Sequence, residues 1–181
     1  KVPFKRLLHP EKEAARLIAD GKLVGWFQGR MEFGQRALGN RSILVDPRKS
    51  SNKDLINDAV KYRERFRPFA PAILSDRVDE YFHTEGKRCS MFMERVYPFR
   101  EECRHLVPAV VHVDGTGRLQ TVDRDSNPLF HGLISAFADI TGVPLVLNTS
   151  FNVSGEPIVC TPMDALRTFF TCGLDVLIMG H

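Results

Sequence analysis

The sequence is poor in the features that mark membrane, disulfide-bonded and metal-binding proteins. No apolar run approaches the roughly 20 residues needed to span a bilayer, and no signal-type apolar core follows the first residues. The four cysteines form no C-x-x-C pair, and the six histidines show no metal-ligand spacing. We therefore expect a cytoplasmic protein with reduced thiols, no metal site of its own and no membrane association.

The sequence also lacks the short motifs that identify common catalytic sites. It contains no Walker pattern, no kinase-type glycine loop, no Gly-x-Ser-x-Gly and no paired-carboxylate or Cys/His nucleophile arrangement. Cys89, Cys160 and Cys172 stand among apolar or small neighbours, and His112 stands in an apolar run, so we expect all four to be buried. The sequence therefore predicts none of these common catalytic arrangements.

What the sequence does have is the composition of one globular domain. Its 181 residues are 43% hydrophobic and 26% charged, without repeats or low-complexity tracts, which is typical of a single folded unit. Helices are predicted at 10–20, 51–60, 76–82, 128–141 and from 161, strands at 23–28, 42–45, 72–74, 144–147 and 174–179, and a hairpin from 109–113 and 119–122. The alternation of these elements indicates a single α/β domain with a mixed sheet.

The positive charge is concentrated in two short segments. The net charge is only +3, yet Gly29 to Arg41 carries three arginines against one glutamate, and Lys61 to Arg67 carries four cations against one glutamate. A compact polyanion such as a nucleotide needs such local clusters, whereas a long nucleic acid usually needs a wider basic surface. The distribution therefore favours a small phosphorylated ligand.

The first basic segment combines arginines with glycines. Arginines at 30, 36 and 41 alternate with glycines at 29, 34 and 39. Glycine lets the backbone approach a ligand closely, and the guanidinium fork matches phosphate oxygens. A surface loop with solvated arginines is the alternative interpretation.

The second basic segment leaves a helix and enters a proline-fixed extended run. Alternate residues of extended backbone point the same way, so Arg65 and Arg67 are expected to project together, with Pro68 fixing the direction of Arg67. The alternative is a basic helix end that faces water.

A third segment, Leu147 to Pro157, is polar and follows a buried strand. Open α/β sheets commonly bind ligands at the carboxyl ends of strands. Asn148, Thr149, Ser150 and Asn152 supply amide and hydroxyl groups able to bond phosphate, ribose or a carbamoyl amide. Such residues also build ordinary turns, which is the alternative here.

Together, three stretches resemble one enzyme family. Gly29-Arg-Met-Glu-Phe-Gly-Gln-Arg-Ala-Leu-Gly-Asn-Arg-Ser42, Phe66-Arg-Pro-Phe-Ala-Pro71 and Leu147-Asn-Thr-Ser-Phe-Asn152 resemble the carboxy-terminal region of the O-carbamoyltransferases of nodulation-factor and antibiotic biosynthesis. The Ser150-x-Asn152 pair is also similar to the S-x-N motif of YrdC-like threonylcarbamoyl-adenylate synthases. The resemblance covers nearly the whole chain. It implies a YrdC-like twisted mixed sheet flanked by helices around a basic concave site, in one domain spanning 1–181, with the family's amino-terminal ASKHA-like transfer domain absent.

The resemblance also implies a reaction and a set of site residues. ATP, with Mg²⁺, and carbamoyl phosphate would give carbamoyl-adenylate with release of pyrophosphate and phosphate, and the missing domain would pass the carbamoyl group to a hydroxyl. Arg36, Lys61 and Arg67 would bind phosphates, and Arg118 would close over the carbamoyl phosphate or the adenylate. The residues implied as catalytic are Lys61, Arg67, Ser150 and Asn152, and those implied as substrate-binding are Arg36, Lys61, Arg67, Arg118, Asn148, Ser150 and Asn152.

Two readings from other classes stay open at this point. The basic concavity could bind RNA instead, although RNA is not the expected partner, or the domain could be a docking module without activity of its own. Binding of ATP and then of carbamoyl phosphate distinguishes these readings.

Overall fold

A computed structural model of the chain describes residues 3–62 and 67–180. Within these residues, one seven-stranded sheet has the order β4-β5-β3-β6-β2-β1-β7. The strands are β1 (Val24–Phe27), β2 (Arg41–Val45), β3 (Ala70–Leu74), β4 (Arg95–Pro98), β5 (Thr116–Val122), β6 (Leu145–Ser150) and β7 (Val176–Met179). The helices are α1 (Pro10–Ala19), α2 (Ser51–Ile56), the π-helix η1 (Asn57–Lys61), the 3-10 helix η2 (Ser75–Arg77), α3 (Val78–Tyr81), α4 (Glu101–Arg104), α5 (Pro128–Thr141) and α6 (Pro162–Thr171).

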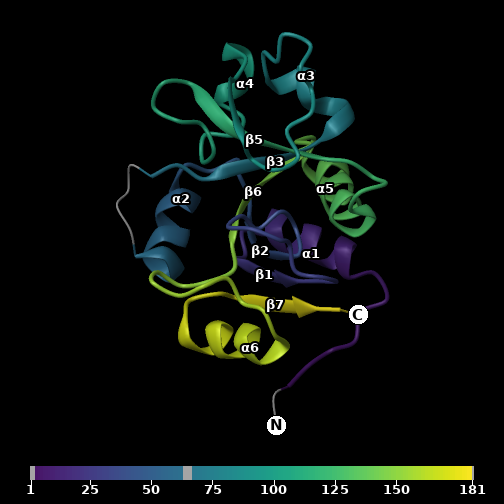
Figure 1. Ribbon diagram of the computed structural model, residues 1–181, viewed down its shortest axis with the longest axis vertical. Helices are drawn as coiled ribbons and strands as arrows, with labels where there is room; N and C mark the ends of the chain where they lie inside the picture. The colour runs from purple at the N-terminus through teal and green to yellow at the C-terminus, as the bar shows by residue number, and fades with distance from the viewer. Residues whose placement is uncertain (1–2, 63–66, 181) are drawn as a thin grey trace.

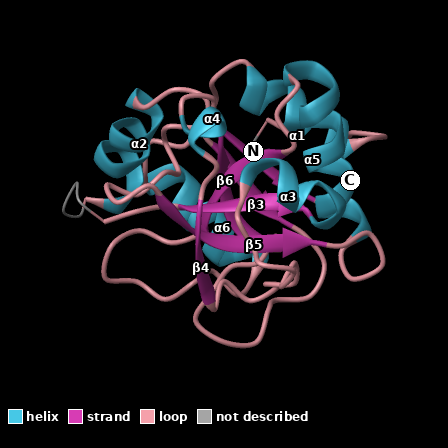
Figure 2. Ribbon diagram, turned by 90° about the horizontal axis from the view of Figure 1, so that it is seen from above, coloured by secondary structure: helices cyan, strands magenta, loops and turns pink. Residues whose placement is uncertain are grey.

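The sheet is mixed, as the sequence predicts. The pairs β1–β7 and β3–β5 are parallel, whereas β1–β2, β2–β6, β3–β6 and β4–β5 are antiparallel. In Figure 1, α2 lies to one side of β6 and α5 to the other. The view from above in Figure 2 shows α3 and α4 over the end of the molecule where β3, β4 and β5 lie. The single α/β domain with flanking helices is therefore confirmed.

Part of the core lies between the sheet and the two helices α1 and α5, and the core also includes Ile56 of α2 and Val60 of η1. Helix α1 buries Ala14, Ala15 and Ile18, and α5 buries a face of four large apolar side chains that includes Phe130. Strands β1, β2 and β3 are buried along their whole length, as expected of central strands that are covered on both faces. Each large apolar side chain that is fully buried contributes about 1.5–3 kcal/mol.

Helices α5 and α6 begin with recognisable caps. The Asn127 side chain accepts a hydrogen bond from the backbone N–H of Phe130, and Pro128 occupies the first turn of α5. In α6, Thr161 and Asp164 form a reciprocal capping box. Local chemistry thus fixes both starts.

The predicted hairpin is wrong. Residues 109–113 form no strand, and β5 pairs instead with β4, which the sequence did not indicate, and with β3. Strand β4 is mostly exposed and therefore shows no buried alternation. The short helix α4 was also not predicted.

The expected burial of the cysteines and of the histidine is likewise not observed. Cys89 and Cys160 are exposed and Cys172 is half-buried, and all four cysteines are free of disulfides. His112 is half-buried, with Nδ1 3.0 Å from Thr116 Oγ1. Apolar sequence neighbours were misleading because these residues lie in loops or at an element's end rather than under a layer of the fold. No helix in the described ranges is long and apolar enough to cross a membrane.

Candidate functional site

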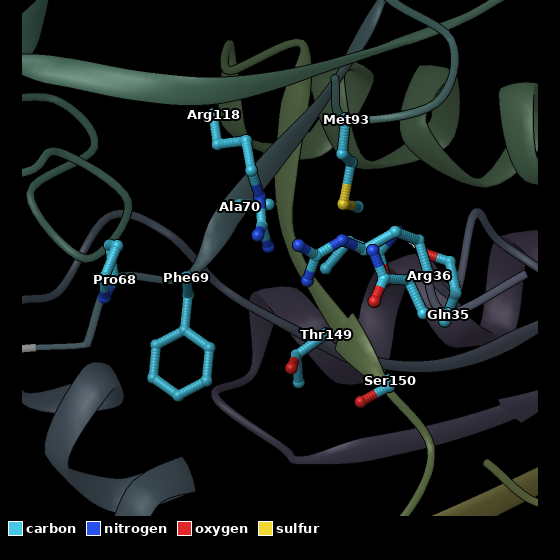
Figure 3. A pocket seen from close by; sticks show the side chains of 11 residues that line it. Gln35, Arg36, Pro68, Phe69, Ala70, Met93, Arg118, Thr149 and Ser150 are labelled. Carbon is cyan, nitrogen blue, oxygen red and sulfur yellow. Dashed lines mark hydrogen bonds between the residues drawn. The ribbon is translucent and has the colours of Figure 1, made fainter. Parts of the chain in front are cut away.

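A small cavity lies where the carboxyl end of β6 meets the amino end of β3. Its volume is about 70 Å³. Figure 3 shows side chains that converge on it from the first basic loop, the start of β3, the loop before β4, β5 and β6. The lining residues are Gln35, Arg36, Ala37, Pro68, Phe69, Ala70, Met93, Arg118, Asn148, Thr149 and Ser150. The cavity thus joins parts of the first and third segments that the sequence singled out to the proline-fixed run that follows the second basic segment.

Two arginines dominate the cavity. Figure 3 shows the guanidinium groups of Arg36 and Arg118 pointing into it and toward one another. Arg36 is exposed on its loop, and Arg118 is half-buried on β5. Two cations that face one another repel, and an anion bound between them attracts both and offsets this repulsion. Guanidinium forks are also well suited to bidentate bonds with phosphate oxygens.

The loop that carries Arg36 is braced from within. Glu32 Oε1 accepts hydrogen bonds from the backbone N–H groups of Leu38, at 2.9 Å, and Asn40, at 2.7 Å. Trp26 Nε1 donates to the carbonyl oxygen of Gly39 at 2.8 Å. These bonds hold the backbone on both sides of the loop tip, so Arg36 is presented from a preorganised segment.

Gly39 is required at its position by both conformation and space. Its φ is +115°, a value that L side chains rarely adopt, and a Cβ there would lie 2.2 Å from a ring carbon of Phe130. The loop therefore packs directly on helix α5. This contact explains one of the glycines that the sequence pattern contained.

Arg41 does not serve as a phosphate ligand in this structure. Its side chain is 4% exposed and donates to the carbonyl oxygens of Gln28, Gly29 and Asn40, at 2.7–3.2 Å. The guanidinium also stacks 3.6 Å from the centre of the Phe27 ring. Burial lowers the pKa of Arg41, since desolvation disfavours the charged form. Arg41 thus holds the base of the loop together.

Lys61 is delivered by the π-helix that continues α2, where the sequence predicted one uninterrupted helix. The π-helix ends at Lys61 and is followed by Tyr62, which has a left-handed φ of 44°. Lys61 is 5% exposed, and its Nζ lies 2.6 Å from Ser150 O, 2.9 Å from Asn152 O, 2.8 Å from Asn152 Oδ1 and 3.3 Å from Ser150 Oγ. Its ammonium therefore ties the end of the π-helix to the turn after β6, and Lys61 does not itself line the cavity.

The turn that Lys61 holds is also closed by its own side chains. Ser150 Oγ donates to Asn152 Oδ1 at 2.6 Å, and Asn152 Nδ2 donates to the carbonyl oxygen of Glu156 at 2.6 Å. Ser150 lines the cavity, whereas Asn152 does not. The Ser150-x-Asn152 motif and Lys61 thus come together in one hydrogen-bonded unit at the cavity wall.

The second basic segment is only partly described. Arg67 is exposed next to Pro68, which lines the cavity, whereas Arg67 itself does not line it. The expected pairing of Arg65 with Arg67 involves residue 65, which lies outside the described residues.

Two amide side chains connect the cavity to the braced loop. Asn148, 1% exposed, donates from Nδ2 to the carbonyl oxygen of Ala37, at 3.1 Å, and to Gln120 Oε1, at 2.7 Å. Gln120, 2% exposed on β5, donates from Nε2 to the carbonyl oxygen of Leu38 at 2.8 Å. Sequence reasoning missed Gln120, although a glutamine inside an apolar strand was a usable signal. Over the described ranges, no group of three or more His, Cys, Asp or Glu residues could hold a metal ion.

Comparison with known proteins finds one matching family model and several close relatives. Residues 15–181 match the family model described as "Carbamoyltransferase C-terminus". The chain is 55% identical to nodulation protein NolNO of Sinorhizobium fredii, over 92% of this chain and 25% of that protein, and 51% identical to NolO of Bradyrhizobium diazoefficiens, over 92% and 31%. It is 42% identical to a 3'-hydroxymethylcephem-O-carbamoyltransferase of Streptomyces clavuligerus, over 83% and 28%. The chain therefore spans between a quarter and a third of the length of these relatives.

Solved structures share the fold at low sequence identity. P. abyssi Sua5 complexed with L-threonine matches with a TM-score of 0.68 at 18% identity, over 97% of this chain and 48% of that one. Full-length HypF in the phosphate- and nucleotide-bound form matches with a TM-score of 0.66 at 16% identity, over 98% of this chain and 22% of that one. The expected YrdC-like fold is thereby confirmed.

Proposed function

The chain belongs to the carbamoyltransferase C-terminal family, and from this premise we propose that it is the carbamoyl-adenylate-forming part of an ATP-dependent O-carbamoyltransferase. The observation that carries the proposal is the pair of arginines, Arg36 and Arg118, that face one cavity with polar groups of β6. That HypF is titled as phosphate- and nucleotide-bound gives further support.

The size of the cavity fits a small phosphorylated group. Its volume of about 70 Å³ is far below that of pockets for drug-sized ligands, which have about 300–1,000 Å³. The phosphate and carbamoyl groups would occupy the cavity, and the nucleoside of ATP would extend along the open surface. This arrangement brings the two reacting groups together between fixed cations.

The proposed reaction consumes one water and needs no side-chain nucleophile. Hydrolysis of carbamoyl phosphate gives carbamate and phosphate. A carbamate oxygen then attacks the α-phosphorus of ATP, the bond to the β-phosphate breaks, and pyrophosphate leaves with its electron pair. The sum is carbamoyl phosphate plus ATP plus water to carbamoyl-adenylate, phosphate and pyrophosphate. Catalysis would come from holding the anions and offsetting their charge.

The side chains divide into those that bind and those that position. Arg36 and Arg118 would hold phosphate oxygens, and exposed Arg67 would reach the ligand from beside the cavity. Ser150 Oγ would orient the substrate from the wall, in a turn that Lys61 and Asn152 keep in shape. Mg²⁺ would arrive on the phosphates of ATP, where it neutralises charge on the departing pyrophosphate.

The transfer step is assigned to a domain outside these 181 residues. The relatives are three to four times longer than the matched part, so we propose that an amino-terminal domain of the same polypeptide passes the carbamoyl group to an acceptor hydroxyl. The cytoplasm, where ATP is abundant, is the proposed location. Mass spectrometry tests the division of labour: the 181-residue chain alone, stripped of metal, should leave an acceptor unchanged, and an acceptor heavier by one carbamoyl group would contradict it.

Calorimetry separates the proposal from the two other readings. Titrating ATP and then carbamoyl phosphate at physiological salt should give saturable binding, and a short double-stranded RNA should bind far more weakly. Equal or stronger binding of RNA would favour an RNA-binding module. Absence of binding by either phosphorylated ligand would favour a docking domain.

A further inference from the structure

Asn148 carries a buried acceptor that nothing in the described residues satisfies. Its side chain is 1% exposed, it lines the cavity, and its Oδ1 has neither a hydrogen-bond partner nor appreciable contact with solvent. Buried polar atoms in proteins nearly always have a partner, so an orphan of this kind calls for an explanation. Its position at a ligand-sized cavity suggests that the partner is a ligand.

The direction of this acceptor is fixed by its neighbours. Asn148 Nδ2 donates to two acceptors, the Ala37 carbonyl and Gln120 Oε1, so reversing the amide would place oxygen against oxygen. Gln120 cannot reverse either, because its Nε2 donates to the Leu38 carbonyl. The two amide side chains thus form a hydrogen-bond chain with fixed donor and acceptor roles that is anchored on the backbone of the loop. In this chain Asn148 Oδ1 is the acceptor that has no donor.

The other polar groups of the cavity set the chemistry of the matching donor. Arg36 and Arg118 have donors only and suit phosphate oxygens. A ligand that satisfies all three side chains needs acceptor oxygens at one end and an N–H donor a few atoms away. Carbamoyl phosphate has both, since its phosphate bears the oxygens and its carbamoyl group ends in –NH₂. Acetyl phosphate has the same shape but ends in –CH₃, which would leave Oδ1 unsatisfied.

We propose that Asn148 Oδ1 accepts a hydrogen bond from the carbamoyl –NH₂ and makes the site specific for carbamoyl over acyl phosphates, with Gln120 as its positioning residue. The proposal rests on the function proposed above and names the determinant of its substrate class. Arg36 is exposed and forms part of the cavity wall, so its side chain would shift as the ligand enters and then bind the phosphate. The amino group of adenine is the other N–H source, and the small volume of the cavity favours the carbamoyl group.

The test is calorimetric titration of the chain in the cold with freshly dissolved carbamoyl phosphate, acetyl phosphate and inorganic phosphate. The wild type should bind carbamoyl phosphate about tenfold tighter than acetyl phosphate, the worth of one satisfied buried acceptor. Asn148→Leu should bind both equally, because leucine offers no acceptor to the carbamoyl –NH₂. Asn52→Leu is the matched control, because Asn52 is 6% exposed and lies outside the cavity, and it should keep the tenfold preference.

Each outcome decides the proposal. Equal binding of the two acyl phosphates by the wild type, or a preference retained by Asn148→Leu, would overturn it while leaving the proposed function intact. Failure of all three phosphates to bind would overturn both. A preference for ATP over ITP that disappears in Asn148→Leu would assign Oδ1 to adenine and overturn the carbamoyl assignment. If the leucine variant does not fold, Asn148→Ala gives the same comparison.

Discussion

Replacing Lys61 with methionine should destabilise the fold strongly, because the buried ammonium group of Lys61 stabilises the turn after β6 through hydrogen bonds. Methionine keeps an unbranched chain but removes the ammonium that donates to Ser150 O, Asn152 O and Asn152 Oδ1, all within 2.9 Å in the wild type. Ser150 O and Asn152 Oδ1 each keep one other donor, the Asn152 backbone N–H and Ser150 Oγ. Hydrogen bonds to a charged group contribute about 1.5–3 kcal/mol each. Since water can satisfy part of the loss, we expect a cost of about 3 kcal/mol, or a melting temperature lower by about 6–12 °C for a domain of this size.

The assay is urea and thermal unfolding of Lys61→Met beside Lys22→Met. Lys22 is the matched control, because it is a half-exposed lysine with a 3.5 Å ion pair to Asp175. Its replacement should cost less than about 1 kcal/mol. The opposite result would be a Lys61→Met chain that is as stable as the Lys22→Met chain but does not support adenylate formation in the longer polypeptide. That result would refute the role of Lys61 in holding the turn and would indicate that Lys61 binds the ligand directly.

Three further changes test the site and the loop. Arg67→Lys should slow adenylate formation nearly as much as Arg67→Ala, by about ten- to a hundredfold, since lysine loses the planar guanidinium fork. A wild-type rate in the lysine variant would show that Arg67 is not part of the site. The control is Arg77→Ala, which loses only a surface ion pair with a glutamate. Gly39→Ala should destabilise by about 2–5 kcal/mol, because the new methyl group meets an aromatic ring and the positive φ is strained. Gly21→Ala, with φ +84° and open space around it, should cost only about 1–2 kcal/mol, and equal urea midpoints for the two alanine variants would contradict the packing argument. Burial lowers the pKa of His112, so acid protonates it first in the unfolded chain; the free energy of unfolding should fall as the pH drops below about 7. In urea titrations of His112→Asn, the free energy of unfolding should fall less steeply below about pH 7 than in the wild type. An unchanged slope would contradict the assignment of this pH dependence to His112.

Local signals were enough to predict most of the fold. Asn127 with Pro128, and Thr161 with Asp164, announce helix starts that the structure realises as caps. Buried strands such as β6 were visible as short apolar runs. The paired strand β4 was not, because an exposed edge strand has no buried alternation and its partner is set by distant packing.

The site could be predicted only as a set of segments. Sequence brought forward Arg36, Arg118 and Ser150, and these line one cavity. It could not show that Arg41 turns inward to three carbonyl oxygens or that Lys61 clamps a turn, since both depend on contacts between residues distant in the chain. For the same reason the hydrogen-bond chain through Gln120 was invisible until β5 and β6 were placed.

Exchange of labelled pyrophosphate into ATP tests the central claim most directly, in a polypeptide that joins this chain to its amino-terminal domain. The account predicts exchange that requires carbamoyl phosphate and falls by about a hundredfold or more in Arg36→Ala and Arg118→Ala, with Arg77→Ala near the wild-type rate. Exchange that persists in both cavity variants, or that proceeds without carbamoyl phosphate, would contradict adenylate formation between these two arginines.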